Sequence, residues 1–166
     1  RGLGDVYKRQ HPSSFHRRHR MSLHSSGQFA VALPAARAID LFTPEGERMW
    51  VPGWDPTYPT GGPSEDPGTV FVTDSGGIET IWVVLEIDRR RATAAYVRTT
   101  PGRHAGIVRV ACADTTEGHC AVTVIYNMTL LGDDASAIDA YAEHNFERMM
   151  EEWSGAIDAS LGTPLT

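Results

Sequence analysis

Residues 137–161 read AIDAYAEHNFERMMEEWSGAIDASL, and this stretch decides the fold. Its apolar residues return at about 100° per residue, which is the period of an α-helix. They form one stripe, made of Ile138, Ala142, Phe146, Met149, Trp153, Ala156 and Ile157. Acidic residues occupy the opposite side, at Glu143, Glu147, Glu151 and Asp158. The stretch predicts one amphipathic helix, about 37 Å long at 1.5 Å per residue, whose apolar face must be covered by another layer.

The covering layer is predicted by the segments that precede this helix. Between residues 68 and 131, strand-like runs alternate with a period of two, and short turns separate them. The runs are GTVFVTD (68–74), IETIWVVLEID (78–88), ATAAYVRTT (92–100), AGIVRVACAD (105–114) and HCAVTVIYNMTLL (119–131). Turns this short leave no room for crossover helices, so we expect an antiparallel meander and exclude a doubly wound parallel sheet.

The preceding part of the chain adds a strand, two short helices and a loop. GQFAVAL at 27–33 is an apolar run typical of a strand. Residues 34–50 predict two short helices, with Thr43 as a candidate N-cap of the second. Residues 51–67 are so rich in Pro and Gly that they predict a long loop, with at most a brief extended piece near residues 54–58.

Length and composition indicate one folded domain after a distinct leader. The chain has 166 residues, 41% of them hydrophobic, which suits a single core. Residues 1–20 carry six Lys or Arg, one acidic residue and no helical or strand period, so we expect a disordered leader. Its beginning, RGLGDVYKRQ, resembles a sequencing adapter read in frame, so we expect Met21 to be the native start and residues 21–166 to form the domain.

The predicted domain is strongly acidic. The chain has 15 Lys or Arg and 21 Asp or Glu, and removing the six basic and one acidic residues of the leader leaves nine and 20, a net charge of about −11. Such a surface repels phosphate backbones and anionic lipid headgroups, so we expect neither nucleic-acid binding nor stable membrane association. No apolar run approaches 18 residues and no signal-peptide pattern is found, which predicts a cytoplasmic protein. Nothing in the sequence indicates an oligomeric state.

The residues that most often form metal, redox or catalytic motifs are scattered here. Cys112 and Cys120 are expected to be buried, inert thiols, although they flank a turn and a cross-strand disulfide is the alternative. His104, His119 and His144 lack a metal-binding spacing, and no nucleophile-elbow, P-loop or dinucleotide pattern occurs. The sequence therefore predicts no metal site, no cofactor and no catalytic residue.

Five segments carry a resemblance to a known family. They are LFTPEGERMWVPGW (41–54), GTVF (68–71), YVRTTPG (96–102), VIYNMTLL (124–131) and FERMMEEW (146–153). Together with the order of elements over residues 27–161, they resemble bacterial members of the START-related helix-grip superfamily (SRPBCC), which includes polyketide cyclase-like and birch-pollen-allergen-like proteins. The resemblance implies an α+β helix-grip fold, in which a curved antiparallel sheet of six to seven strands wraps around a long C-terminal helix and two short helices follow the first strand. The pattern yields six strands, so we expect the seventh near residues 54–58.

This resemblance implies a largely apolar cavity between the sheet and the long helix. Aromatic and methionine walls, with a few polar groups, suit a flat or flexible apolar ligand. The ligand-binding candidates are Trp54, Tyr58, Trp82, Tyr96, Arg98, Tyr126, Met128, Asn145, Phe146, Met149 and Trp153. Plain core packing is the alternative for the apolar members of this set. Trp50, Trp54 and Tyr58 are expected to fold over the cavity mouth as a lid, or else to form a surface for a partner protein.

Two polar candidates depend on which way their elements face. Arg98 shares strand parity with Tyr96, so if both face inward Arg98 offers a fixed cation for a carboxylate or phenolate. Otherwise both face solvent, or Arg98 pairs with a carboxylate such as Glu79. On the helix, Asn145 lies at the edge of the apolar stripe, whereas His144 points to the solvated side.

Three functions fit these observations. The first is a non-enzymatic carrier or sensor of a small hydrophobic or aromatic molecule, such as a lipid, a quinone or a polyketide-like metabolite. The second is a cyclase- or dehydratase-like enzyme, in which Tyr96, Arg98 and Tyr126 orient the substrate and stabilise enolate charge, but no catalytic base is evident on the inner faces. The third is a chaperone-associated interaction module, which predicts a collapsed cavity.

Overall fold

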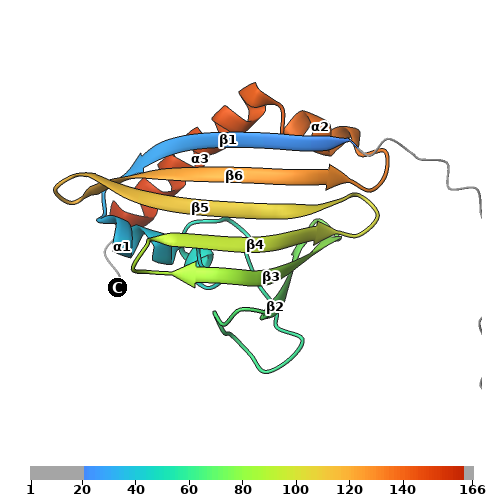
Figure 1. The fold of residues 1–166 in the computed structure, drawn as a ribbon, viewed down its shortest axis with the longest axis horizontal. Helices are drawn as coiled ribbons and strands as arrows, with labels where there is room; N and C mark the ends of the chain where they lie inside the picture. Colours follow the sequence, from blue (N-terminus) through green and yellow to red (C-terminus); the bar gives the residue numbers. More distant parts are fainter. Residues whose placement is uncertain (1–20, 163–166) are drawn as a thin grey trace, which may run out of the picture.

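The computed structural model describes residues 21–162, so the predicted leader lies outside the described residues. Six strands form one curved antiparallel sheet, with the order β1-β6-β5-β4-β3-β2 (Figure 1). The strands are β1 Ser22–Val31, β2 Val70–Ser75, β3 Ile78–Asp88, β4 Thr93–Thr100, β5 His104–Thr116 and β6 His119–Leu130. Five consecutive strands form the predicted meander, and β1 pairs with the last of them.

Strand β1 is longer than the sequence predicts. It begins at Ser22, whereas the apolar run that indicated a strand begins at Gly27. The added residues, SLHSS, are mostly polar, but each pairs with β6, from Ser22 opposite Thr129 to Ser26 opposite Ile125. Pairing with a distant segment therefore extends the strand where local sequence gives no signal.

The expected seventh strand is reduced to a single bridge. Thr57 pairs antiparallel with Val72, and the two residues exchange backbone N–H···O bonds of 2.9 and 2.8 Å. The bridge lies within the stretch where the sequence predicts the missing strand. Pro56 and Pro59 have no N–H to extend the ladder, which limits the pairing.

Short helical segments follow β1 and pack against β4, β5 and β6 at one end of the concave face. They are α1 Ala35–Ala38, η1 Ile39–Phe42, which continues α1 as a 3₁₀ helix, and η2 Gly46–Met49, also a 3₁₀ helix. Thr43 links η1 to η2. Its hydroxyl donates to the carbonyl of Asp40 at 3.0 Å and accepts from the backbone N–H of Gly46, the first residue of η2, at 3.0 Å. The N-cap of η2 is Glu45, which makes no side-chain capping bond, so Thr43 is not the N-cap that the sequence predicts.

The C-terminal helix is broken near its start, whereas the sequence predicts one helix over residues 137–161. Helix α2 covers Ala135–Ala140, helix α3 covers Glu143–Gly162, and a turn joins them. The prediction of a single unbroken helix is therefore wrong over its first turn. No helix of the described chain combines the length with the apolar character needed to cross a bilayer.

Side chains stabilise the backbone at this break. The amide of Asn145 donates to the carbonyl of Asp139 at 2.8 Å, and the hydroxyl of Ser25 on β1 donates to the carbonyl of Tyr141 at 2.7 Å. These bonds satisfy carbonyl groups that have left the helical ladder. The break also turns Ile138 outward, where its side chain is 40% exposed, so its predicted place in the buried stripe is wrong.

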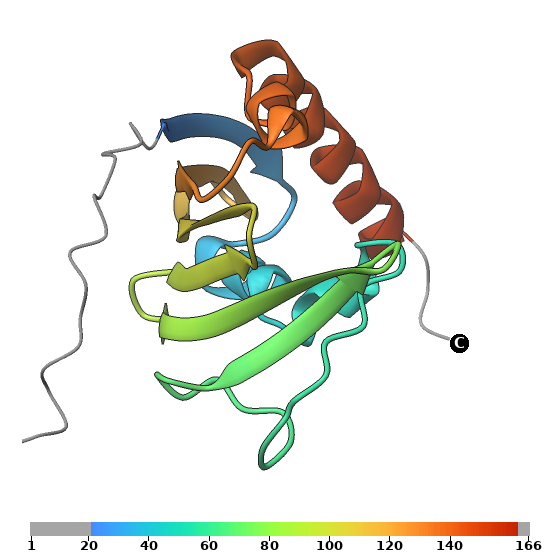
Figure 2. The same cartoon turned by 90° about the vertical axis from the view of Figure 1, so that its right-hand side faces the viewer.

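Helix α3 packs mainly against β1 and lies over the open side of the curved sheet (Figure 2). Gly27 allows the close contact, because a Cβ there would lie 2.5 Å from Cγ of Met150 and 3.2 Å from the ring of Phe146. Met149 and Trp153 are only half-buried and face the interior beside β3, β4 and β5. A space therefore remains between α3 and these three strands.

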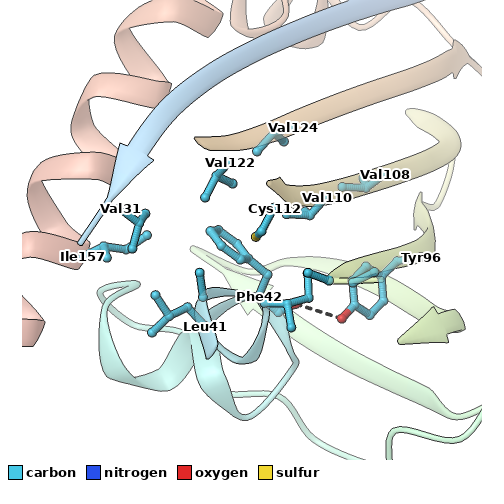
Figure 3. Close-up of a cluster of buried hydrophobic side chains, with 14 of the residues drawn as sticks. Val31, Leu41, Phe42, Tyr96, Val108, Val110, Cys112, Val122, Val124 and Ile157 are labelled. Carbon is cyan, nitrogen blue, oxygen red and sulfur yellow. Dashed lines mark hydrogen bonds between the residues drawn. The ribbon is translucent and has the colours of Figure 1, made fainter. Parts of the chain in front are cut away.

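Phe42 lies at the centre of the hydrophobic core (Figure 3). Its ring packs edge to face with Phe29 at 6.3 Å and with Trp50 at 5.8 Å between centroids. Small side chains of β5 and β6 surround it, namely Val108, Val110, Cys112, Val122 and Val124. The carbonyl of Phe42 accepts a 2.8 Å hydrogen bond from the hydroxyl of Tyr96, which ties η1 to β4.

Both cysteines belong to this core and are free thiols. Burial, with a smaller contribution from Cys120, raises the pKa of Cys112 to about 12. Such a thiol stays protonated at neutral pH and is a poor nucleophile. The structure thus has the inert thiols that the sequence predicts and not the alternative disulfide.

We expect Gly27→Ala to lower the free energy of unfolding by about 1–3 kcal/mol, because the new methyl group overlaps Met150 and must displace that side chain or α3. Gly155→Ala is the matched control. A Cβ at this exposed position of α3 meets nothing within 4 Å, so the change should be neutral or stabilising by up to about 1 kcal/mol. Urea unfolding measures both variants, and equal stabilities would contradict the close packing at Gly27.

Candidate functional site

A cavity of about 480 Å³ lies between α3 and the concave face of the sheet. Its size is within the range of small-molecule sites. The cavity is lined by side chains from η2, the loop after it, β2 to β6, α2 and α3. Seven predicted ligand-binding residues come together in this lining, namely Trp54, Trp82, Tyr96, Arg98, Tyr126, Met149 and Trp153. The strand residues of this set thus face inward, the orientation on which their candidacy depends.

The other four predicted residues do not line the cavity. Met128 and Phe146 are 2% and 1% exposed and belong to the core, which was the alternative for both. Asn145 binds the turn between α2 and α3 instead. Tyr58 donates its hydroxyl to Oε1 of Glu45 at 2.8 Å and does not belong to the lining.

The two tryptophans predicted to form a lid lie in different places. Trp50 is buried, and its indole N–H donates to the carbonyl of Leu41 at 2.7 Å. Its predicted place in a lid is therefore wrong, since it packs in the core. Trp54 lines the cavity, but its indole N–H donates to the carbonyl of Pro44 at 2.7 Å, which fixes the ring against the short helices.

Stacked aromatic rings form the flat side of the cavity. Trp82 and Phe71 are parallel within 2°, with centroids 5.8 Å apart. Trp54 and Tyr96 meet Trp82 edge to face at 5.8 and 6.4 Å. The indole N–H of Trp82 donates to Oγ1 of Thr73 at 3.0 Å, so the ring presents an apolar surface.

Arg98 brings a cation to one end of the cavity. Its Cζ lies 5.4 Å from the ring centroid of Trp82 and 6.0 Å from those of Tyr126 and Tyr141. One terminal nitrogen donates to the hydroxyl of Tyr141 and, at 3.1 Å, to Nε2 of His104. Its Nε is buried and has no hydrogen-bond partner among the described residues. This guanidinium is therefore oriented but incompletely bonded.

His104 and Asp134 form a chain of hydrogen bonds that ends at Arg98. Because arginine only donates, Nε2 of His104 accepts, and its Nδ1–H donates to Oδ2 of Asp134 at 3.0 Å. Burial lowers the pKa of His104, and the positive charge of Arg98 adds to this effect, so the ring is neutral at pH 7. Burial alone would raise the pKa of Asp134, but hydrogen bonds from Arg103, Ser136 and His104 hold it well below its ordinary value. The carboxylate already has a counter-ion in Arg103, 2.9 Å away.

The two tyrosine hydroxyls predicted to orient a ligand differ in availability. The Tyr96 hydroxyl is engaged by the carbonyl of Phe42, so it serves the fold. The Tyr126 hydroxyl has no hydrogen-bond partner among the described residues, although the side chain is 7% exposed and lines the cavity. Burial raises the pKa of Tyr126, with Arg98 opposing, so its hydroxyl remains a proton donor at neutral pH.

Glu47 on η2 is an acid in the cavity wall that the sequence did not reveal. Its carboxyl group accepts no hydrogen bond from a described residue, and burial raises its pKa to about 8. After burial itself, the charge of Glu47 is the main factor raising the pKa of Tyr96, and it also raises that of Tyr126. Glu47 therefore shares the cavity with both tyrosines and can exchange a proton close to neutral pH.

Two features explain why Glu47 and Tyr141 were not predicted. A four-residue 3₁₀ helix such as η2 has no stripe from which an inward side can be inferred. In an unbroken helix Tyr141 would lie well away from the apolar stripe, and only the break after α2 lets it line the cavity.

Asp134 was not predicted either. It precedes α2 as its N-cap, and its contact with His104 joins segments that are 30 residues apart in the sequence.

A larger depression of about 900 Å³ lies between β1 and α3. It is open to solvent, and its lining includes Gln28 and the carboxylates of Glu147, Glu151 and Asp158. Phe29 is the aromatic side chain of this lining. Because it offers neither an enclosed apolar wall nor an unpaired cation, we assign the candidate site to the smaller aromatic cavity.

Glu47→Gln should change the pH dependence of stability. Since the pKa is raised from 4.5 to about 8, the folded state keeps a proton that the unfolded state releases, and this contribution to stability falls as pH rises through that interval. We expect the variant to match wild type near pH 4 and to exceed it above pH 8 by on the order of 1–2 kcal/mol. Urea unfolding across this range measures the difference. Asp74→Asn, at the exposed carboxylate of the same lining, is the control, and parallel profiles of wild type and Glu47→Gln would contradict the prediction.

Solved structures of other proteins resemble this chain in fold. No family model and no curated protein matches the sequence. Norcoclaurine synthase from Thalictrum flavum has a similar structure, with a TM-score of 0.65 and 10% identity, over 93% of this chain and 95% of that one. Ara h 8.0201 has a TM-score of 0.61 and 11% identity, over 86% and 100% of the two chains. The Zhui aromatase/cyclase from Streptomyces sp. R1128 has a TM-score of 0.59 and 13% identity, over 85% and 96%. Together with the six-stranded curved sheet and the C-terminal helix, these similarities show that this chain has the helix-grip fold.

Proposed function

We propose that this protein binds a small aromatic or otherwise flat apolar molecule in the cavity between α3 and the sheet. The observation that carries the proposal is the wall of tryptophan rings. The indole N–H groups of Trp54 and Trp82 bond to protein oxygens, so these rings offer apolar surface and little else. Burying such surface against a ligand is favourable, whereas leaving it exposed to water is not.

The comparisons support a ligand of this class. One structure of norcoclaurine synthase, at 9% identity and a TM-score of 0.62, is a complex with dopamine and hydroxybenzaldehyde, which are small aromatic molecules. The Zhui protein is described as an aromatase/cyclase. A cavity of about 480 Å³ suits a ligand of two or three fused rings or a short acyl chain.

Ligand binding can be tested on the full chain with fatty acids, quinones, flavonoids and polyketide-like aromatics. We expect at least one aromatic class to raise the melting temperature in proportion to its concentration, and native mass spectrometry to show one bound molecule. Trp153→Ala should reduce the affinity at least about tenfold, because it removes part of the wall. The ligand-induced shift is compared, not the melting temperature itself, since Trp153 also packs on Trp50. Leu85→Ala, at a 40% exposed residue of β3, is the control. The absence of any shift across the panel would refute the proposal.

A second candidate function is a cyclase- or dehydratase-like enzyme, and Glu47 favours it. A carboxylate with a pKa near 8 can take a proton from carbon next to a carbonyl group. The negative charge then formed on the carbonyl oxygen can be stabilised by Arg98 and by the free hydroxyl of Tyr126, which line the same cavity. Glu47 is thus a candidate for the base that is not evident from the sequence.

Proton exchange tests this second candidate directly. In D₂O, we expect the protein to exchange the α-protons of 2-tetralone, a bicyclic aromatic ketone, as followed by ¹H NMR. Each turnover moves one proton to Glu47, forms the enolate, and returns a deuteron from solvent to carbon. Glu47→Gln should slow exchange by about 10²-fold or more, whereas Asp74→Asn should not. If wild type does not exceed the background rate while ligands still bind, the enzyme candidate fails and the binding proposal stands.

The third function considered from sequence, a chaperone-associated interaction module, depends on a collapsed cavity. The cavity is open in the described chain, with half-buried aromatic and charged side chains facing it. No described feature of the outer surface offers comparable support, and we do not propose this function.

A further inference from the structure

We propose that Arg98 is an anion-binding group and that the ligand of the cavity is an aromatic acid, with a carboxylate or phenolate oxygen seated on this guanidinium. This inference rests on the proposed binding function and specifies the chemistry of its ligand. The ligand then has one orientation, with its anionic oxygen at the Arg98 end of the cavity and its rings along Trp54 and Trp82.

The first observation is that Arg98 has no counter-ion. Within residues 21–162, no carboxylate lies at ion-pair distance from it, and Glu79, the partner considered from sequence, is exposed. Every other arginine of this range either pairs with a carboxylate or is exposed to solvent. Arg98 alone among them is half-buried without a carboxylate partner. Burying a cation even partly without a counter-ion is costly, and an anion arriving with the ligand would offset that cost.

The second observation is that the groups touching Arg98 are neutral. His104 accepts from Arg98 through Nε2 and carries its proton on Nδ1, and Tyr141 contributes a hydroxyl. Asp134 is charged, but it contacts His104 and not Arg98, and it is already paired with Arg103. These contacts therefore fix the direction of the guanidinium without neutralising it, as expected for a preorganised anion site.

The third observation is that donors near Arg98 remain unused. Its second terminal nitrogen, Nη2, makes no hydrogen bond within residues 21–162, and the Tyr126 hydroxyl, whose ring lies under the guanidinium, is free as well. A carboxylate has two oxygens that match the fork of an arginine, and a phenolate oxygen can accept from the same donors. The rings of Trp82 and Tyr126 flank this point, so the acid group must be attached directly or by a short link to a flat body.

Matched ligands test the inference on the wild-type protein by isothermal titration calorimetry. We expect 2-naphthoate to bind at least about tenfold more tightly than 2-naphthamide, which has the same shape and no charge. A second pair, 4-nitrophenolate and 4-nitroanisole at a pH where the phenol is ionised, distinguishes a phenolate from a carboxylate as the preferred anion. A preference for the charged member of either pair supports the inference.

Arg98→Gln should abolish the preference for the charged ligand while retaining weak binding of the neutral one. Arg109→Gln is the matched control, because it makes the same change in net charge at an exposed residue of β5. Arg98→Lys keeps the charge without the fork and should give an intermediate preference. If Arg98→Gln does not fold, the ligand pairs on wild type decide the question.

The failures of the two proposals are distinguishable. If charged and neutral ligands bind equally well and Trp153→Ala weakens both, the cavity binds aromatic molecules and the role of Arg98 is overturned. If no member of either pair binds, and the wider panel gives no shift, both the binding function and the anion site are refuted. A preference for the charged ligand that persists in Arg98→Gln would also overturn the role of this residue.

Discussion

Gly27 has no side chain, and this allows α3 to press against β1 at the edge of the sheet. Because the helix leans on that edge, it does not lie directly on β3, β4 and β5, and the middle of the concave face is left uncovered. The short helices fill one end of this space, with Phe42 at the centre of the packed part. The remainder is the aromatic cavity. The position of the site therefore follows from the close packing of α3 on an edge strand.

Most of the architecture could be predicted from periodicity. Alternation with a period of two located the five meander strands, because each has one face in the core and one toward solvent. The helical period located α3 for the same reason. What could not be predicted was decided by partners far along the chain. Pairing with β6 extends β1 back to Ser22, and the hydroxyl of Ser25 helps to stabilise the break at Tyr141.

The candidate site was predictable only in part. Trp82, Tyr96 and Tyr126 were candidates for the cavity wall, and the structure has them in its lining, but the sequence alone left open which side of each strand faces inward. Parity cannot tell whether a hydroxyl is free, and the Tyr96 hydroxyl is occupied by a backbone carbonyl. On α3, Met150 is buried beside Gly27 while Met149 faces the cavity, a distinction set by the lean of the helix. Glu47 lay on a segment too short to show any pattern.

The wall formed by the Pro-rich loop has an evolutionary consequence. A regular strand in that place would impose a register on every side chain, so that an insertion of one residue would reverse the whole face. Here a single bridge at Thr57, the indole bond of Trp54 to Pro44, and side-chain bonds of Asp55, Tyr58 and Glu65 attach the loop to the rest of the domain at separate points. Between such points of attachment, a chain tolerates changes in length and composition. Descendants of this protein can therefore acquire new ligand preferences by altering this loop. Strand β4, which carries Arg98, and helix η2, which carries Glu47, can stay the same.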